Sequence, residues 1–144
     1  MDPRRDTRWW GWGDPEESGS LNEASEAMLM EREILPESAP VLPALGEVKV
    51  PPAQPLPDSI TDLVGAANVF TNDEDRIRHS GGQSYLDLPG RRSGVIDAAP
   101  DAVVVPADAG QIAPLLDICA EAGIAVVPFG GGTSVVGGIA PIRG

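Results

Sequence analysis

A strand–helix–strand pattern in the last third of the chain constrains the fold more than any other feature. The apolar run 102–105 predicts a strand buried on both faces, and the run 124–127 predicts a second strand. Between them, Asp108 resembles a helix cap and Gly123 a helix end, with a kink or a later start expected at Pro114. The apolar face of this helix comprises Ile112, Leu115, Leu116, Cys119 and Ala122. The pattern predicts an α/β (α+β) fold.

The second predicted strand leads into a glycine-rich loop. Glycine accepts positive φ and lets backbone N–H groups approach a ligand closely, while Thr133 and Ser134 add hydroxyl groups. A loop of this kind at the carboxyl end of a strand is typical of a site for an anionic group, here a diphosphate. The alternative is a tight glycine turn without a ligand. The residues predicted to bind the ligand are Pro128, Gly130, Gly131, Gly132, Thr133, Ser134 and Val135.

Three other glycine motifs are excluded by inspection. A Walker loop needs a lysine beside its last glycine, but the only lysine, Lys49, lies in a proline-rich stretch. The dinucleotide fingerprint fails because Val135 stands where its last glycine is needed. A serine-hydrolase elbow around Ser134 fails because Val136 stands where the motif needs its last glycine. The sequence also has one histidine, His79, so no second histidine is available for a triad.

Charge and composition argue against several kinds of partner. The formal net charge of −12 argues against nucleic acid, whose phosphates need clustered cations. One histidine and one cysteine are too few for a zinc cluster, so no metal site is predicted, and Cys119 is interpreted as a small buried hydrophobe. Because no apolar run approaches the ~20 residues of a membrane span, we expect a soluble, cytoplasmic protein without a transmembrane segment.

The first 57 residues are predicted to form an N-terminal extension. All the tryptophans lie in residues 9–12, and they predict a strap against a folded body because free tryptophan side chains would expose large apolar surfaces. A helix is predicted over Leu21 to Leu35, capped by Ser20 and ended by Pro36. The proline density of residues 36–57 then predicts an extended linker.

Residues 58–144 are predicted to form a second unit. Short helices are expected at 59–67 and 72–78, and the second of these would start at Thr71 or Asn72. Residues 79–88 are interpreted as a loop, and residues 90–94 as a turn.

The residues Pro128 to Gly138 resemble the flavin-diphosphate loop of the FAD-linked oxidases of the vanillyl-alcohol oxidase superfamily, which share a PCMH-type FAD-binding domain. Within it, the chain is most similar to the alkyldihydroxyacetonephosphate synthase (alkylglycerone-phosphate synthase) family. Three further features support that choice: the Trp-Gly-Trp-Gly unit, Asp75-Arg76 before a polar loop, and the stretch 100–106. The resemblance implies that residues 58–144 begin the FAD-binding domain, and that the rest of this domain and the catalytic residues lie beyond Gly144.

The resemblance also implies a cofactor and a reaction. FAD would bind non-covalently, since His79 stands in no attachment motif known in the synthase group. The expected parent enzyme exchanges the acyl group of acyl-dihydroxyacetone phosphate for a fatty alcohol in ether lipid synthesis. Two alternatives stay open: an FAD-linked oxidase of a 2-hydroxy acid such as lactate or glycolate, and a non-catalytic module that binds a phosphate metabolite. The partners implied are FAD and a small-molecule or lipid substrate, and a homodimer of the full-length parent is left open.

Overall fold

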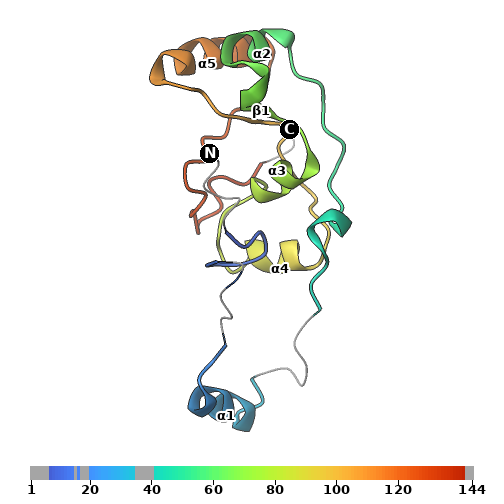
Figure 1. Cartoon of the computed structure of the whole chain (residues 1–144), viewed down its shortest axis with the longest axis vertical. Coiled ribbons are helices and arrows are strands. Elements are labelled where there is room, and N and C mark those ends of the chain that lie inside the picture. Colours follow the sequence, from blue (N-terminus) through green and yellow to red (C-terminus); the bar gives the residue numbers. More distant parts are fainter. Residues whose placement is uncertain (1–6, 15, 17–19, 35–40, 142–144) are drawn as a thin grey trace.

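The computed structural model describes residues 7–14, 16, 20–34 and 41–141, which contain short helices and one small antiparallel sheet (Figure 1). The predicted mixed fold class is therefore confirmed. The α-helices are α1 (Glu23–Glu31), α2 (Asp58–Val64), α3 (Asp73–Arg78), α4 (Asp87–Arg92) and α5 (Ile112–Glu121). The strands are β1 (Val69–Phe70) and β2 (Val103–Val104), and the 3-10 turns are η1 (Leu45–Glu47), η2 (Ala66–Asn68) and η3 (Ala109–Gln111).

Helices α2 and α5 lie side by side at one end of the molecule (Figure 1). Ile60 of α2 forms a buried cluster with Leu115 and Cys119 of α5. The two strands pair antiparallel with Val69 opposite Val104, and both valines pack against this cluster. The sheet is thus held by the helix pair, and β2 is half-buried rather than buried on both faces as predicted, because no second layer covers its outer side among the described residues.

The local signals for α5 correspond closely to its structure. Asp108 caps the 3-10 turn η3, and the α-helix begins only afterwards, so Pro114 falls in its first turn, where a backbone N–H needs no partner. The predicted later start is therefore confirmed, and Gly123, with a φ of 68°, ends the helix. Ile112 and Leu116, assigned to the apolar face, are instead 48% and 46% exposed.

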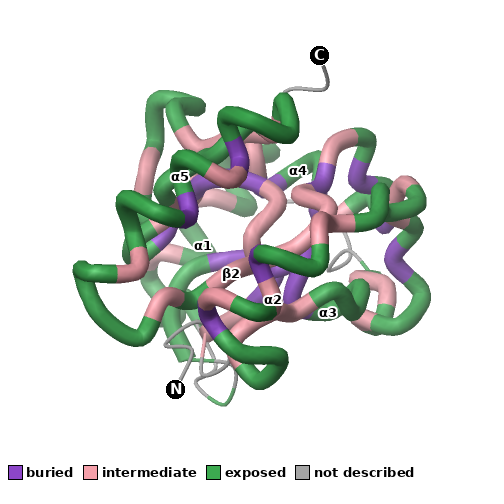
Figure 2. Tube along the Cα trace, turned by 90° about the horizontal axis from the view of Figure 1, so that it is seen from above, coloured by how far each residue is buried: buried purple, intermediate pink, exposed green. Residues whose placement is uncertain are grey.

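A second buried cluster includes the first tryptophan of the chain. Trp9 packs with Val48, Ile77, Ile96 and Ala99, and Trp10 lies against the same cluster. In Figure 2 the buried segments lie towards the interior of the molecule and the exposed segments form its outside. The tryptophan segment therefore lies against the folded body, as its composition predicts.

The described part of the proline-rich stretch, residues 41–57, is packed onto the same body. Lys49 forms an isolated parallel bridge with Val95: its N–H donates to the Gly94 carbonyl at 2.9 Å, and its carbonyl accepts the Ile96 N–H at 2.9 Å. Residues on both sides of position 57 thus contribute to one core, while the division into units at that position stays a prediction.

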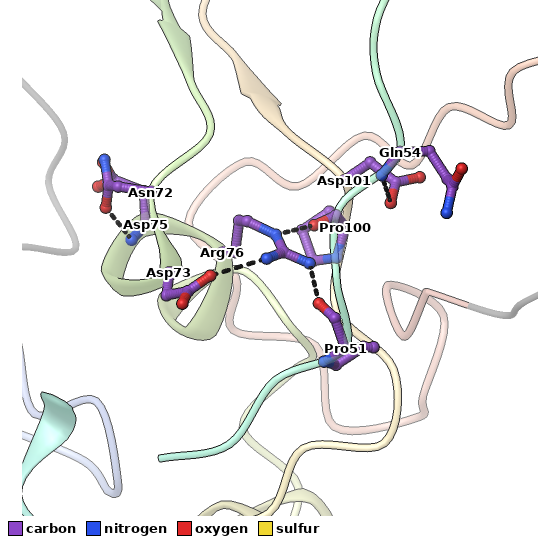
Figure 3. Close-up of polar contacts among 8 residues, drawn as sticks. All are labelled: Pro51, Gln54, Asn72, Asp73, Asp75, Arg76, Pro100 and Asp101. Atoms are coloured by element: carbon purple, nitrogen blue, oxygen red, sulfur yellow. Dashed lines mark hydrogen bonds and ion pairs between the residues drawn. The ribbon is translucent and has the colours of Figure 1, made fainter. Parts of the chain in front are cut away.

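Arg76 of α3 ties three segments together (Figure 3). Asn72 caps α3, as predicted, by accepting a backbone N–H from the first turn. The Arg76 guanidinium donates to the carbonyls of Pro100 at 2.8 Å and Pro51 at 2.6 Å, and it pairs with Asp73 at 2.8 Å. Arg76 itself is 2% exposed. A single buried side chain therefore satisfies two loop carbonyls that have no regular secondary structure to pair with.

Residues 124–127 do not form the second strand that their apolar run predicted. No strand is assigned there, and Val126 and Val127 are 44% and 40% exposed. A strand needs a neighbour to complete its ladder of hydrogen bonds, and no described strand lies beside this segment. The strand–helix–strand unit is thus a strand, a helix and an extended segment that leads into the glycine loop.

Helix α4 was not predicted from the sequence, which indicated a loop at 79–88 and a turn at 90–94. Ser84 and Asp87 cap its start reciprocally: the Ser84 N–H and hydroxyl donate to Asp87 Oδ2 at 3.0 and 2.7 Å, and the Asp87 N–H donates to Ser84 Oγ at 3.1 Å. Burial of Leu88 and Arg91 then stabilises a helix that contains Gly90.

Helix α1 is shorter than predicted and begins at another cap. Asn22, rather than Ser20, accepts the Ser25 N–H at 2.9 Å, and Glu33, with a φ of 54°, lies just past the helix end. Leu35 and Pro36, the predicted end, lie outside the described residues. No residue of α1 is buried, and Figure 1 shows the helix apart from the other elements.

Candidate functional site

The glycine loop, residues 128–135, has a backbone that only glycine adopts easily at two positions. Gly130 and Gly132 have φ values of 57° and 63°. The Gly132 N–H donates to the Phe129 carbonyl at 3.0 Å, which closes a turn. The positive φ values that the sequence predicts for these glycines are therefore present, whereas binding of a diphosphate stays a prediction, and the Gly132 amide is engaged within the loop in this conformation.

Four further residues of the glycine loop have backbone donors without a hydrogen-bond partner among the described residues. Within the described ranges, no hydrogen bond is made by the N–H groups of Gly130, Gly131, Thr133 and Ser134, or by the two hydroxyl groups. Gly130, Gly131 and Thr133 are exposed and Ser134 is half-buried, so a ligand can reach these N–H groups, and a run of free donors is the feature that an anion needs. No acidic side chain lies within residues 128–135 to oppose a negative ligand.

Gly131 provides a test of whether the loop fits a closely bound group. Its φ is not positive, and a Cβ placed on it would meet only the Thr133 methyl group at 3.8 Å, an ordinary contact. The described part of the chain therefore does not require glycine at this position. A ligand that approaches the backbone closely does require it, so the residues present fit a diphosphate group.

The two end residues of the predicted site, Pro128 and Val135, are both exposed. Pro128 is exposed at the start of the loop, and Val135 is 64% exposed at its end. The resemblance to the FAD-linked oxidases also implies that Val135 and Val136 pack behind the loop, but Val136 is 87% exposed, so that expectation is wrong in the described structure. The reason is that no other described segment covers this side of the loop.

A second segment, which the sequence indicated only as polar loop, contacts the glycine loop directly. We call residues 79–83 the docking loop. The Gln83 N–H donates to the Ser134 carbonyl at 2.7 Å, and the His79 and Phe129 rings lie 4.5 Å apart between centroids. A Cβ on Gly82 would collide with the Ser134 carbonyl oxygen. The glycine pair at 81–82 was the only sequence signal for such a close approach.

The docking loop is itself held by the tryptophan segment and by α4. The Trp12 indole N–H donates to the Gln83 carbonyl at 3.1 Å, and Arg91 donates to the Gly81 carbonyl at 2.6 Å. Arg91 also reaches the Trp9 carbonyl at 3.5 Å. Burial lowers the pKa of the Arg91 guanidinium, and the nearby Asp87 carboxylate opposes that shift. These contacts give the docking loop a defined position without regular secondary structure.

His79 has a structural place at the end of α3. Its Nδ1 lies 2.7 Å from the Asp75 carbonyl oxygen, and its ring packs on Phe129.

In the part of the chain that the structure describes, no group of three or more acidic, histidine or cysteine side chains comes together as a metal site. Within the same ranges, no helix has the length and apolar character that a membrane crossing needs.

Comparisons with known proteins relate this geometry to a family. Residues 100–144, which include the glycine loop, match the family described as FAD binding domain. A relative in Trypanosoma brucei brucei, "Alkyldihydroxyacetonephosphate synthase", is 27% identical over 97% of this chain and 27% of its own length. "Protein Rv2250A" of Mycobacterium tuberculosis is 30% identical over 69% of this chain and 68% of its own length.

The fold also has a counterpart among solved structures. An alkyldihydroxyacetonephosphate synthase structure superposes with a TM-score of 0.82 and covers 99% of this chain and 31% of that chain, at 22% sequence identity. The likeness shows that the two share a fold over this stretch. The chain thus spans less than a third of the length of the synthases that it matches.

Proposed function

This chain belongs to the FAD-linked oxidase superfamily, and on that premise we propose that its glycine loop binds the diphosphate of FAD in an enzyme of the alkyldihydroxyacetonephosphate synthase type. The observation that carries the proposal is that the N–H groups of Gly130, Gly131, Thr133 and Ser134 have no hydrogen-bond partner among the described residues, within the stretch that matches the FAD binding domain. The open space at Gly131 supports it, because a diphosphate can approach the backbone there.

Each part of the loop has a different role in this proposal. The N–H groups of Gly130 and Gly131 and the groups of Thr133 and Ser134 donate to the diphosphate oxygens. The positive φ at Gly130 and Gly132, which glycine adopts without strain, would let the loop turn its N–H groups towards one ligand. Pro128 and Val135 mark the two ends of the loop and would contact the cofactor through apolar atoms.

We propose that the cofactor is held without a covalent bond. His79 packs its ring on Phe129 and has Nδ1 at 2.7 Å from the Asp75 carbonyl, so it already has a structural role. When bound, FAD supplies the reactive isoalloxazine ring, while this part of the chain binds and orients its diphosphate. For the whole protein, we propose exchange of the acyl group of acyl-dihydroxyacetone phosphate for a fatty alcohol, in keeping with the name of the trypanosomal relative.

The test is the absorbance spectrum of the purified protein, as its gene encodes it, before and after acid precipitation. We expect a flavin spectrum whose chromophore passes entirely into the acid supernatant. Flavin that stays in the pellet would overturn non-covalent binding. A protein that neither carries flavin nor takes up added FAD would overturn the family function and favour binding of another phosphate metabolite.

A second measurement locates the cofactor on the loop. Amide resonances of residues 130–134 should shift when FAD is added, and also with ADP, which carries the same diphosphate. Adenosine, which lacks phosphate, serves as the control ligand and should leave them in place. Equal shifts with adenosine would place binding elsewhere.

A further inference from the structure

We propose that the docking loop, residues 79–83, is a positioning element of the cofactor site, and that Trp12 acts on the glycine loop through it. This inference rests on the proposed function, since it concerns the same site. It assigns a role in FAD binding to residues that lie outside the stretch matching the FAD binding domain.

The first step is the contact between the two loops at Ser134. The Gln83 N–H holds the Ser134 carbonyl at 2.7 Å, which fixes the orientation of the peptide plane that follows Ser134. Gly82 allows this approach, because any side chain there would occupy the position of the carbonyl oxygen. Ser134 supplies two of the free donors, its N–H and its hydroxyl. The bond from Gln83 therefore fixes the carbonyl of a residue that is proposed to bind the cofactor.

The second step is the contact at the other end of the loop. The His79 ring lies 4.5 Å from the Phe129 ring, and the Phe129 carbonyl accepts the Gly132 N–H that closes the glycine turn. The docking loop thus holds both sides of the turn that contains Gly130 and Gly131. Glycine residues lose more conformational freedom on ordering than any other residue, so a preformed turn binds more tightly than a mobile one.

The third step connects the docking loop to the N-terminal segment. The Trp12 indole N–H donates to the Gln83 carbonyl, the same residue whose N–H holds Ser134. The two bonds lie on adjacent peptide groups of one residue and so resist its rotation.

The test compares two glycine-to-alanine changes in the protein as its gene encodes it. Gly82→Ala places a Cβ against the Ser134 carbonyl oxygen, whereas Gly90→Ala, in α4, places one where no atom lies within 4 Å. Both changes restrict the unfolded chain alike, and Gly90→Ala also favours helix α4, so a loss of FAD affinity in Gly82→Ala alone reports the collision. We expect Gly82→Ala to raise the FAD dissociation constant roughly tenfold or more, and Gly90→Ala to leave it within about twofold.

The second readout is amide hydrogen exchange at Gly132 and Gln83, whose N–H groups bond to the Phe129 and Ser134 carbonyls, measured without FAD. Exchange there should accelerate in Gly82→Ala and stay unchanged in Gly90→Ala. Because no cofactor is present, this readout remains informative even if the protein never binds FAD, which separates a failure of the inference from a failure of the proposed function. Unchanged exchange and unchanged FAD affinity in Gly82→Ala would overturn the inference.

A milder pair of variants covers the case in which Gly82→Ala does not fold. Trp12→Phe keeps an aromatic ring but loses the five-membered ring that carries the indole N–H bonded to Gln83. Trp10→Phe is the matched control, since the Trp10 ring lies against Arg8 and Arg92. We expect faster exchange at Gly132 and Gln83 and weaker FAD binding for Trp12→Phe alone. Equal effects from the two variants would show general destabilisation and overturn the assigned role.

Discussion

The backbone N–H of Gln83 donates to the carbonyl oxygen of Ser134 at 2.7 Å, and this bond joins a loop after α3 to the glycine loop after α5. The two residues lie in segments that share no secondary structure. The glycine loop is therefore held by a tertiary contact as well as by its own turn. Variants of either segment should alter cofactor binding, whereas variants of the two buried clusters should alter stability.

Gly131→Ala should weaken FAD binding with little effect on stability. The φ of Gly131 is not positive and the space around it is open, so the methyl group is tolerated by the protein but blocks close approach of a diphosphate. We expect a rise of roughly tenfold or more in the FAD dissociation constant, measured by calorimetry, and an unchanged melting temperature. Gly46→Ala, at another open position, is the control. Identical affinities for the two variants would contradict the proposed site.

Arg76→Met should destabilise the protein strongly. The change removes charged donors from the carbonyls of Pro51 and Pro100, each worth about 1.5–3 kcal/mol. We expect the free energy of unfolding in urea to fall by about 3 kcal/mol. Arg32→Met, at an exposed position after α1, should change it by less than about 0.5 kcal/mol. A similar small effect from both variants would show that Arg76 is not needed to hold its three segments.

Cys119 should make stability depend on pH in the alkaline range. Burial raises the pKa of its thiol, because the thiolate is disfavoured away from water. The folded-state pKa lies above the unfolded value of about 8.5, so the contribution is fully present below that pH and is lost as pH rises. We expect the free energy of unfolding to decline above about pH 8.5 by at most ~1.4 kcal/mol per pH unit. The slope should be smaller in Cys119→Ala, and equal slopes would show that the thiol does not titrate this way.

Gln83→Leu should not destabilise the chain without cofactor. The Gln83 Oε1 is buried and unpartnered among the described residues, and such a group costs about 1–3 kcal/mol. Its backbone bonds to Ser134 and Trp12 do not involve the side chain and remain available in the variant. We expect the melting temperature to stay the same or rise, with Gln54→Leu at an exposed position as reference. A clear drop would indicate that the Gln83 side chain is paired in solution.

Elements governed by short-range signals were predictable. Asn72 caps α3 and Gly123 ends α5, because a cap or a left-handed glycine acts on backbone groups within one helical turn. Residues 130–134 were recognisable for the same reason, since glycine conformation is a local property. Helix α4 was missed because its stability comes from burial of Leu88 and Arg91, which the sequence alone does not show.

The sequence by itself determined the Asn72 cap of α3, the end of α5 at Gly123 and the positive φ of the glycine turn, because each depends on φ preferences and hydrogen bonds between near neighbours. Only the tertiary structure decided that Val69 pairs with Val104, that residues 124–127 remain without a strand partner, and that Gln83 holds Ser134. These outcomes depend on which distant segments meet. The energy of such a contact depends on burial and geometry that no local pattern encodes.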